Sequence, residues 1–244
     1  MGMTFGSLFS GIGGFDLGFE RASFECKWQV EIDPYCRRVL TKHWPDVPKW
    51  DDVRTFPPEH GEWGVDCIIG GFPCQDISNA GKRAGIEGER SGLWSEYIRI
   101  VRALRPNYVV VENVAALLGR GMGTVLGDLA ASGYDAEWDC LPACAFGAPH
   151  LRDRAFVIAY PERWRLEGGI LGCCEQETIK PPANRGTSFG TYLGETWSDE
   201  PSVSVLDDGL SGELAEFSSR STGNSVVPQI AEHLARRIAA GASE

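Results

Sequence analysis

The sequence predicts an α/β fold built on a parallel sheet with a ligand site at one edge. Over the first 160 residues, short apolar runs alternate with amphipathic patterns of helical period. A glycine-rich turn follows the first apolar run, and acidic residues end two of the later ones. Alternation of this kind is typical of parallel α/β sheets, whose ligands bind at the carboxyl ends of the strands.

The expected elements follow in order along the chain. Strands are predicted at residues 4–9, 27–31, 65–70, 108–111 and 155–160, which are apolar or β-branched runs. Helices are predicted at residues 14–21, 34–43, 93–104 and 230–240, where apolar residues recur at helical spacing.

The composition changes after residue 160. Residues 161–222 are poorer in apolar side chains, rich in Gly and Ser, and contain more acidic than basic residues. A segment of this kind cannot build a large core of its own. We therefore expect one main domain, residues 1–160 with 223–244, and a small loop-rich insert at 161–222.

Charge and cysteine content exclude several classes of protein. The formal net charge is −11, which rules out a basic coat of the histone type, so that any nucleic-acid contact must be local. No apolar run reaches the ~18–20 residues of a membrane helix. The eight cysteines form no CxxC pair, so no metal site is expected. Without a recognisable signal peptide, we expect a cytoplasmic protein with reduced thiols.

The glycine turn FGSLFSGIGGF, residues 5–15, is the first candidate site. Glycines there let the backbone approach a ligand beside a helix N-terminus, although a simple tight turn would explain them equally well. Glu31 ends the second strand, where an acid accepts hydrogen bonds from ribose hydroxyls, and Asp52 follows the next candidate strand. Together these residues favour a nucleoside-bearing cofactor.

Three further clusters carry reactive side chains. Cys74 in GGFPCQDIS follows a buried strand and lies in a loop, which is where an activated thiolate belongs. Glu112 in Glu-Asn-Val ends an apolar strand, a costly position for an acid unless it is paired or functional. Arg152 and Arg154 are at strand spacing and so face the same way, although charges of this kind also protect edge strands.

In this order and spacing the clusters resemble the cytosine carbon-5 DNA methyltransferases. Besides the Gly-Phe-Pro-Cys loop, the Glu-Asn-Val triplet and the Arg-x-Arg pair, Gly223-Asn224-Ser225-Val226 matches near the end. The resemblance implies a Rossmann-like sheet that binds S-adenosylmethionine, with the insert as a small target-recognition region. It also implies a compact, phage-like or prophage-like member that acts as a monomer on double-stranded DNA in a bacterial or phage-infected cell. A cognate restriction endonuclease is a candidate partner.

The resemblance also assigns roles to residues. Cys74 attacks carbon 6 of a flipped cytosine, Glu112 acts on ring nitrogen 3, and Arg154 with Arg152 holds the base. Phe15 stacks on the cofactor adenine, Glu31 binds the ribose and Asp52 the amine. The full cofactor set is Phe9, Gly11, Gly13, Gly14, Phe15, Glu31, Ile32, Asp52, Val53, Gly71, Pro73, Asn224 and Ser225. Residues 75–93 match a mobile loop that closes over the base. The expected DNA contacts are Gln75, Ser78, Lys82, Arg83, Arg90, Arg163, Arg165 and Arg185.

Three alternatives stay open. A tRNA cytosine-5 methyltransferase shares these motifs, but normally has a Cys-Phe-Thr tripeptide that this sequence lacks. A non-catalytic cofactor-binding or DNA-binding relic is disfavoured by the intact Cys74, Glu112, Arg152 and Arg154. A dinucleotide oxidoreductase would leave the Pro-Cys loop unexplained.

Overall fold

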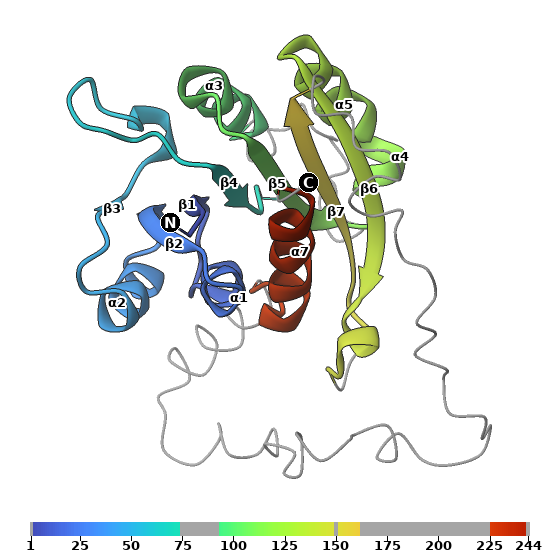
Figure 1. The fold of residues 1–244 in the computed structure, drawn as a ribbon, viewed down its shortest axis with the longest axis horizontal. Coiled ribbons are helices and arrows are strands. Elements are labelled where there is room, and N and C mark those ends of the chain that lie inside the picture. Colours follow the sequence, from blue (N-terminus) through green and yellow to red (C-terminus); the bar gives the residue numbers. More distant parts are fainter. Residues whose placement is uncertain (1, 74–92, 149–150, 162–224, 243–244) are drawn as a thin grey trace.

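A mixed sheet forms the centre of the part of the chain that the structure describes. The computed structural model describes residues 2–73, 93–148, 151–161 and 225–242. In this part of the chain a seven-stranded sheet has the order β3-β2-β1-β4-β5-β7-β6 (Figure 1). The strands are β1 (Thr4–Leu8), β2 (Glu25–Val30), β3 (Lys49–Trp50), β4 (Cys67–Gly70), β5 (Tyr108–Val114), β6 (Tyr134–Pro142) and β7 (Asp153–Pro161).

Helices cover both faces of the sheet. They are α1 (Gly14–Arg21), α2 (Pro34–His43), α3 (Trp94–Leu104), α4 (Leu117–Arg120), α5 (Met122–Ala131) and α7 (Pro228–Gly241), with short 3-10 turns η1 (Val53–Thr55) and η4 (Ala143–Phe146). The side chains of α3, α4 and α5 belong to one buried apolar cluster. Those of α1 and α7 belong to a second cluster, which includes the alternate residues of the same strands.

Every expected strand and helix is present, so the predicted α/β class is confirmed. The alternation of strands and helices predicts a parallel sheet, but the sheet is not parallel throughout, because β7 runs antiparallel to both β5 and β6. The short connection through η4 explains the difference, since antiparallel neighbours need no crossover helix. Glu112 also lies within β5, paired with Phe156 of β7, rather than just beyond a strand.

A buried carboxyl group joins α1 to the sheet beneath it. Asp16 is fully buried and accepts hydrogen bonds from the Ser7 hydroxyl (3.1 Å) on β1 and from the Gln29 amide (2.7 Å) on β2. Burial raises the pKa of Asp16 to about 6, although these hydrogen bonds lower it. The contacts fix the start of α1, and therefore the glycine turn that precedes it, above the ends of β1 and β2.

The C-terminal helix α7 packs directly on α1 (Figure 1). A side chain at Gly18 would collide with Ala231 and with the backbone of Pro228, and one at Gly14 would collide with Ser225 and Val226. The two glycines therefore allow the helix backbones to approach closely. This contact brings the segment that begins at residue 225 back to the start of the domain.

The described residues lack two further features. No helix among them is long and apolar enough to cross a bilayer. The described residues also contain no group of three or more His, Cys, Asp or Glu side chains arranged to hold a metal ion.

Candidate active site

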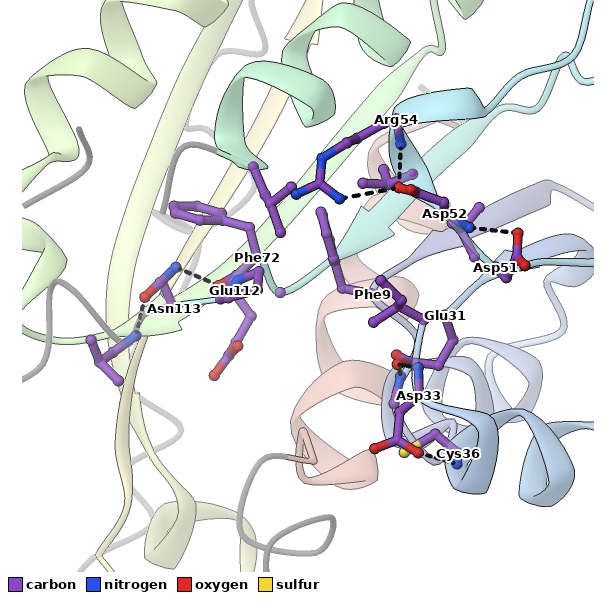
Figure 2. A pocket seen from close by; sticks show the side chains of 18 of the residues that line it. Phe9, Glu31, Asp33, Cys36, Asp51, Asp52, Arg54, Phe72, Glu112 and Asn113 are labelled. Atoms are coloured by element: carbon purple, nitrogen blue, oxygen red, sulfur yellow. Dashed lines mark hydrogen bonds and ion pairs between the residues drawn. The ribbon is translucent and has the colours of Figure 1, made fainter. Parts of the chain in front are cut away.

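A cavity of about 500 Å³ opens at the carboxyl ends of the central strands (Figure 2). It lies where the strand order reverses, because β1 is flanked by β2 on one side and by β4 on the other. In open α/β sheets this switch point is the usual ligand site. Residues that follow β1, β2 and β4 line the cavity together with residues of β5.

The glycine turn after β1 forms one wall of the cavity. Phe9, Gly11 and Gly13 all have positive φ (54°, 57° and 87°), so the backbone turns sharply before α1 begins. Glycine adopts this conformation without strain, which explains Gly11 and Gly13. Nothing lies within 4 Å of a side chain built at Gly11, so its backbone faces open space. The turn can therefore bring main chain close to a ligand.

Glu31, at the end of β2, faces the same space. Its Oε2 accepts a hydrogen bond from the Gly11 N–H (2.7 Å), and its Oε1 accepts one from the Asp33 N–H (2.8 Å). Burial raises the pKa of the Glu31 carboxyl, and these two hydrogen bonds oppose the rise. Each carboxylate oxygen retains a further lone pair, so Glu31 can also accept hydrogen bonds from neighbouring hydroxyl groups.

Asp52 and Val53 form the next part of the wall. Asp52 caps η1, where its Oδ1 accepts the Arg54 N–H (3.0 Å) and lies 3.6 Å from the Arg54 guanidinium. Val53 is buried and, with the exposed side chain of Ile32, adds apolar surface to this end. Acidic and apolar groups that alternate around a concave wall suit a nucleoside, whose base is flat and whose sugar presents hydroxyl groups.

Glu112 lies across the cavity from Glu31 (Figure 2). Its Oε1 is 3.0 Å from Nε of Arg154, and only 8% of the residue is exposed. Burial raises the pKa of the Glu112 carboxyl, while Arg154 and Arg152 lower it. A carboxyl in this balance can hold a proton and donate it to a base ring nitrogen.

The chain just before Cys74 is held against Glu112. A side chain at Gly71 would lie 2.6 Å from Oε2 of Glu112, so any larger residue there would displace the Glu112 carboxylate. Asn113 donates a hydrogen bond from its amide to the Phe72 carbonyl (3.1 Å), which fixes the next residue as well. Pro73 then lines the cavity. These contacts direct the chain toward the Glu112 end of the site.

Arg152 connects this site to the C-terminal segment. It lines the cavity just before β7, and its Nη2 donates to the Ser225 carbonyl at 2.8 Å. Its φ of 26° shows that the backbone is not extended there. Arg152 and Arg154 nevertheless both line the cavity, although Arg152 lies outside the strand whose spacing predicts that they face the same way.

The structure gathers most of the described candidate residues around one cavity. They are Phe9, Gly11, Glu31, Ile32, Asp52, Val53, Gly71, Pro73, Glu112, Arg152 and Arg154. Gly13, Gly14 and Ser225 are not among the lining residues; Gly13 faces Trp44, and Gly14 packs on Ser225. The following candidates lie outside the described residues: Cys74, Asn224, Gln75, Ser78, Lys82, Arg83, Arg90, Arg163, Arg165 and Arg185.

The assignment of Phe15 to adenine stacking is wrong. Its ring is 4% exposed and packs edge-on against Phe19 and Phe156 in the core. Phe15 and Phe19 are four residues apart on α1, so they share the helix face that turns to the sheet. Of the apolar candidates, Phe9, Ile32 and Val53 face the cavity instead.

Several residues of the site were not assigned from the sequence. Asp33 caps α2 by accepting the backbone N–H groups of Tyr35 and Cys36, and an Asp directly before a proline is a recognisable start of a helix. Asn113 is the middle residue of the Glu-Asn-Val triplet, and the sequence predicts no separate role for it. Leu93, the last residue of the expected 75–93 loop, also lines the cavity, and Arg54 does so without any sequence pattern that would reveal it.

Comparison with known proteins identifies the family of this site. The model of the family described as C-5 cytosine-specific DNA methylase matches residues 3–207. The chain belongs to this family. The predicted relationship and the Rossmann-like methyltransferase fold are thus confirmed, and members of the family are generally S-adenosylmethionine-dependent.

Individual members of the family support this membership. The type II methyltransferase M1.HphI of Haemophilus parahaemolyticus is 35% identical over 86% of this chain and 56% of its own length. M.NgoFVII of Neisseria gonorrhoeae is 34% identical over 80% of this chain and 52% of its own. M.AquIA of a Picosynechococcus species is 33% identical over 82% of this chain and 87% of its own length. The chain thus spans about half the length of the first two.

Solved structures show the same fold. A prophage-encoded protein of E. coli, described as a DNA modification methyltransferase, superposes with a TM-score of 0.57 at 27% identity, over 68% of this chain and 48% of that one. DNMT2 of Spodoptera frugiperda has a TM-score of 0.56 at 21% identity, over 68% of this chain and 52% of that one. This likeness concerns the fold alone.

Proposed function

We propose that this protein is a DNA cytosine-5 methyltransferase that uses S-adenosylmethionine. The observation that carries the proposal is the ion pair between buried Glu112 and Arg154, which lies in one cavity with the Gly71–Pro73 segment that leads to Cys74. The same cavity offers acidic and apolar groups suited to a nucleoside at its other end. An acid, the segment that leads to a candidate nucleophile and a candidate cofactor site thus share one space.

The described residues fit this cofactor. Glu31 retains acceptors for the ribose hydroxyls, Asp52 and Val53 can meet the adenine edge, and Phe9 and Ile32 supply apolar surface. Acidic side chains around the cavity also suit a positively charged sulfonium. When bound, S-adenosylmethionine would supply an electrophilic methyl group.

The chain's own residues account for activation of the base. Cys74 as thiolate would add to carbon 6 of a cytosine flipped from the duplex, which makes carbon 5 nucleophilic. Glu112 would donate a proton or hydrogen bond to nitrogen 3, and Arg154 would hold the carbonyl oxygen. After methylation at carbon 5, loss of the proton there would release Cys74.

Removing Glu31 should weaken binding of the cofactor. Glu31→Ala loses a charge-assisted hydrogen bond to the ribose, which is worth on the order of 1.5–3 kcal/mol. Calorimetric titration with S-adenosylmethionine should show this loss. A matched control is Glu137→Ala, because Glu137 is a partly buried acid on β6 that does not line the cavity. If the two variants bind S-adenosylmethionine with equal affinity, Glu31 does not contact the cofactor.

We also propose that residues 161–222 recognise the target sequence and that DNA is the substrate. The phosphate contacts would come from Lys82, Arg83, Arg90, Arg163, Arg165 and Arg185, in a cytoplasmic enzyme that works beside a cognate endonuclease or alone. Support comes from the type II methyltransferases to which the chain is similar.

Transfer of labelled methyl groups tests the proposed function. The purified full chain should transfer label from S-adenosylmethionine to duplex DNA, and bisulfite sequencing of DNA from expressing cells should find methylcytosine in one recurring sequence. Label that enters only tRNA would favour the tRNA methyltransferase. Cofactor binding without any transfer would favour the non-catalytic relic.

A further inference from the structure

Two arginines hold the nucleoside end of the cavity without lining it. The wall at that end consists of two loops, Glu31–Ile32 after β2 and Asp52–Val53 at η1. The strand β3 that leads to the second loop, and that pairs with the end of β2 before the first, is only two residues long. Each loop presents backbone carbonyl groups to a guanidinium from a nearby helix.

Arg37 holds the first loop. It lies in the first turns of α2, and its Nη1 donates hydrogen bonds to the carbonyls of Glu31 and Ile32, both at 2.8 Å. One nitrogen therefore fixes two successive peptide groups. Because Glu31 and Ile32 both line the cavity, their side chains depend on this backbone for their direction.

Arg99 holds the second loop. It lies on α3, and its Nη2 donates to the carbonyls of Val53 (2.9 Å) and Phe56 (2.6 Å). Its Nε donates to Glu96 one turn earlier on the same helix at 2.7 Å. Because α3 packs on the sheet through buried side chains such as Tyr97 and Ile100, Arg99 fastens η1 to a rigid element.

We propose that Arg37 and Arg99 are positioning residues for the cofactor nucleoside, an inference that rests on the proposed cofactor. Arg37 sets the Glu31 loop that meets the ribose, and Arg99 sets the Asp52 loop that meets the adenine edge. Loops held in the bound conformation lose less conformational entropy on binding. Without either arginine, binding must order the loop, so cofactor affinity falls while the later chemical steps keep their geometry.

The chain provides a matched control for each arginine. Arg102 lies one turn beyond Arg99 on α3, but its Nε donates to the Ser132 hydroxyl (2.9 Å), away from the cavity. Arg38 follows Arg37 on α2, with its guanidinium 5.7 Å from the centre of the Tyr35 ring. Substitution of any of the four by methionine removes one charge and leaves a similar aliphatic stem. Arg37→Met and Arg99→Met are the tests; Arg38→Met and Arg102→Met are the controls.

Two probes separate the two loops. S-adenosylhomocysteine carries the adenine amine, and S-inosylhomocysteine lacks it but has the same ribose. Calorimetry on the full chain should show that Arg99→Met lowers the affinity for S-adenosylhomocysteine about tenfold, which corresponds to ~1.4 kcal/mol of binding free energy. The same variant should lower the affinity for S-inosylhomocysteine much less. Arg37→Met should lower the affinities for both compounds by the same factor. Arg38→Met and Arg102→Met should bind both as the wild type does.

Kinetics and a conservative variant complete the test. In methyl transfer, Arg99→Met should raise KM for S-adenosylmethionine far more than it lowers kcat, and Arg99→Lys should recover part of the affinity. If the wild type binds S-adenosylhomocysteine but Arg37→Met and Arg99→Met bind it equally well, the positioning role is refuted. The positioning role is also refuted if Arg99→Met loses the same affinity for both compounds and its Tm falls as well. A wild type that binds neither compound overturns the proposed cofactor as well.

Discussion

Substitution of Cys74 by serine should abolish methyl transfer, with a loss of more than about a thousandfold. A hydroxyl group ionises far less readily than a thiol, so serine cannot supply the nucleophile for carbon 6. The site around Cys74 should survive, because Gly71, Phe72 and Asn113 hold the preceding chain without help from the thiol. Calorimetry should therefore find unchanged binding of S-adenosylhomocysteine.

Covalent capture makes this result specific. Duplex DNA that contains 5-fluorocytosine should form an adduct with the wild type that survives denaturing electrophoresis, because fluorine cannot leave carbon 5 as a proton does. Cys74→Ser should form none. Cys144→Ser is the control, since Cys144 is exposed in η4 and does not line the cavity. Normal turnover by Cys74→Ser would refute the mechanism.

Replacement of Glu112 by glutamine should lower kcat by about 10²–10⁴-fold. The amide keeps the shape of the side chain but cannot deliver a proton to nitrogen 3, and it leaves Arg154 without its charged partner at 3.0 Å. Glu137→Gln is the control, because its amide oxygen can still accept the Tyr160 hydroxyl on the neighbouring strand. A loss below tenfold in single-turnover assays would exclude Glu112 as the proton donor.

The same residue should set a pH limit. Burial raises the pKa of Glu112, so the protonated form persists to higher pH than in an exposed carboxyl group. Glu112 loses this proton, and with it the ability to donate to nitrogen 3, as pH rises through its raised pKa. We therefore expect kcat/KM of the wild type to fall over that range, and Glu112→Gln to lack this dependence at its lower rate.

Sequence patterns located the main strands and the cavity because both depend on local signals. Apolar runs that end in Gly or Glu marked the strand ends, and parallel strands bring such ends to one edge. Strand β6 was missed because its alternating residues include Glu137 and Asp139, which suit an edge strand but resemble a loop. The apolar run of its partner β7 predicts a strand. Nothing in the sequence predicts that this strand runs antiparallel to its neighbours.

Side-chain direction and long-range contacts were harder to predict. Phe15 follows the glycine turn directly, and only the rotation of α1 decides that it meets Phe156 and not the cavity. Arg37 and Arg99 act on backbone carbonyls, which every residue carries, so no motif marks their partners. Contacts of this kind depend on how distant elements pack.

The packing of α7 on α1 has a consequence for synthesis. The two helices lie near opposite ends of the described chain, so the ribosome must make all of the residues between them before they can meet. At about 5–20 residues per second this delay is on the order of ten seconds or more. During that time the apolar residues of α1 that α7 later covers have no partner there. The nascent chain should therefore stay sensitive to proteases and dependent on chaperones until Ala231 reaches Gly18, after which the domain closes cooperatively.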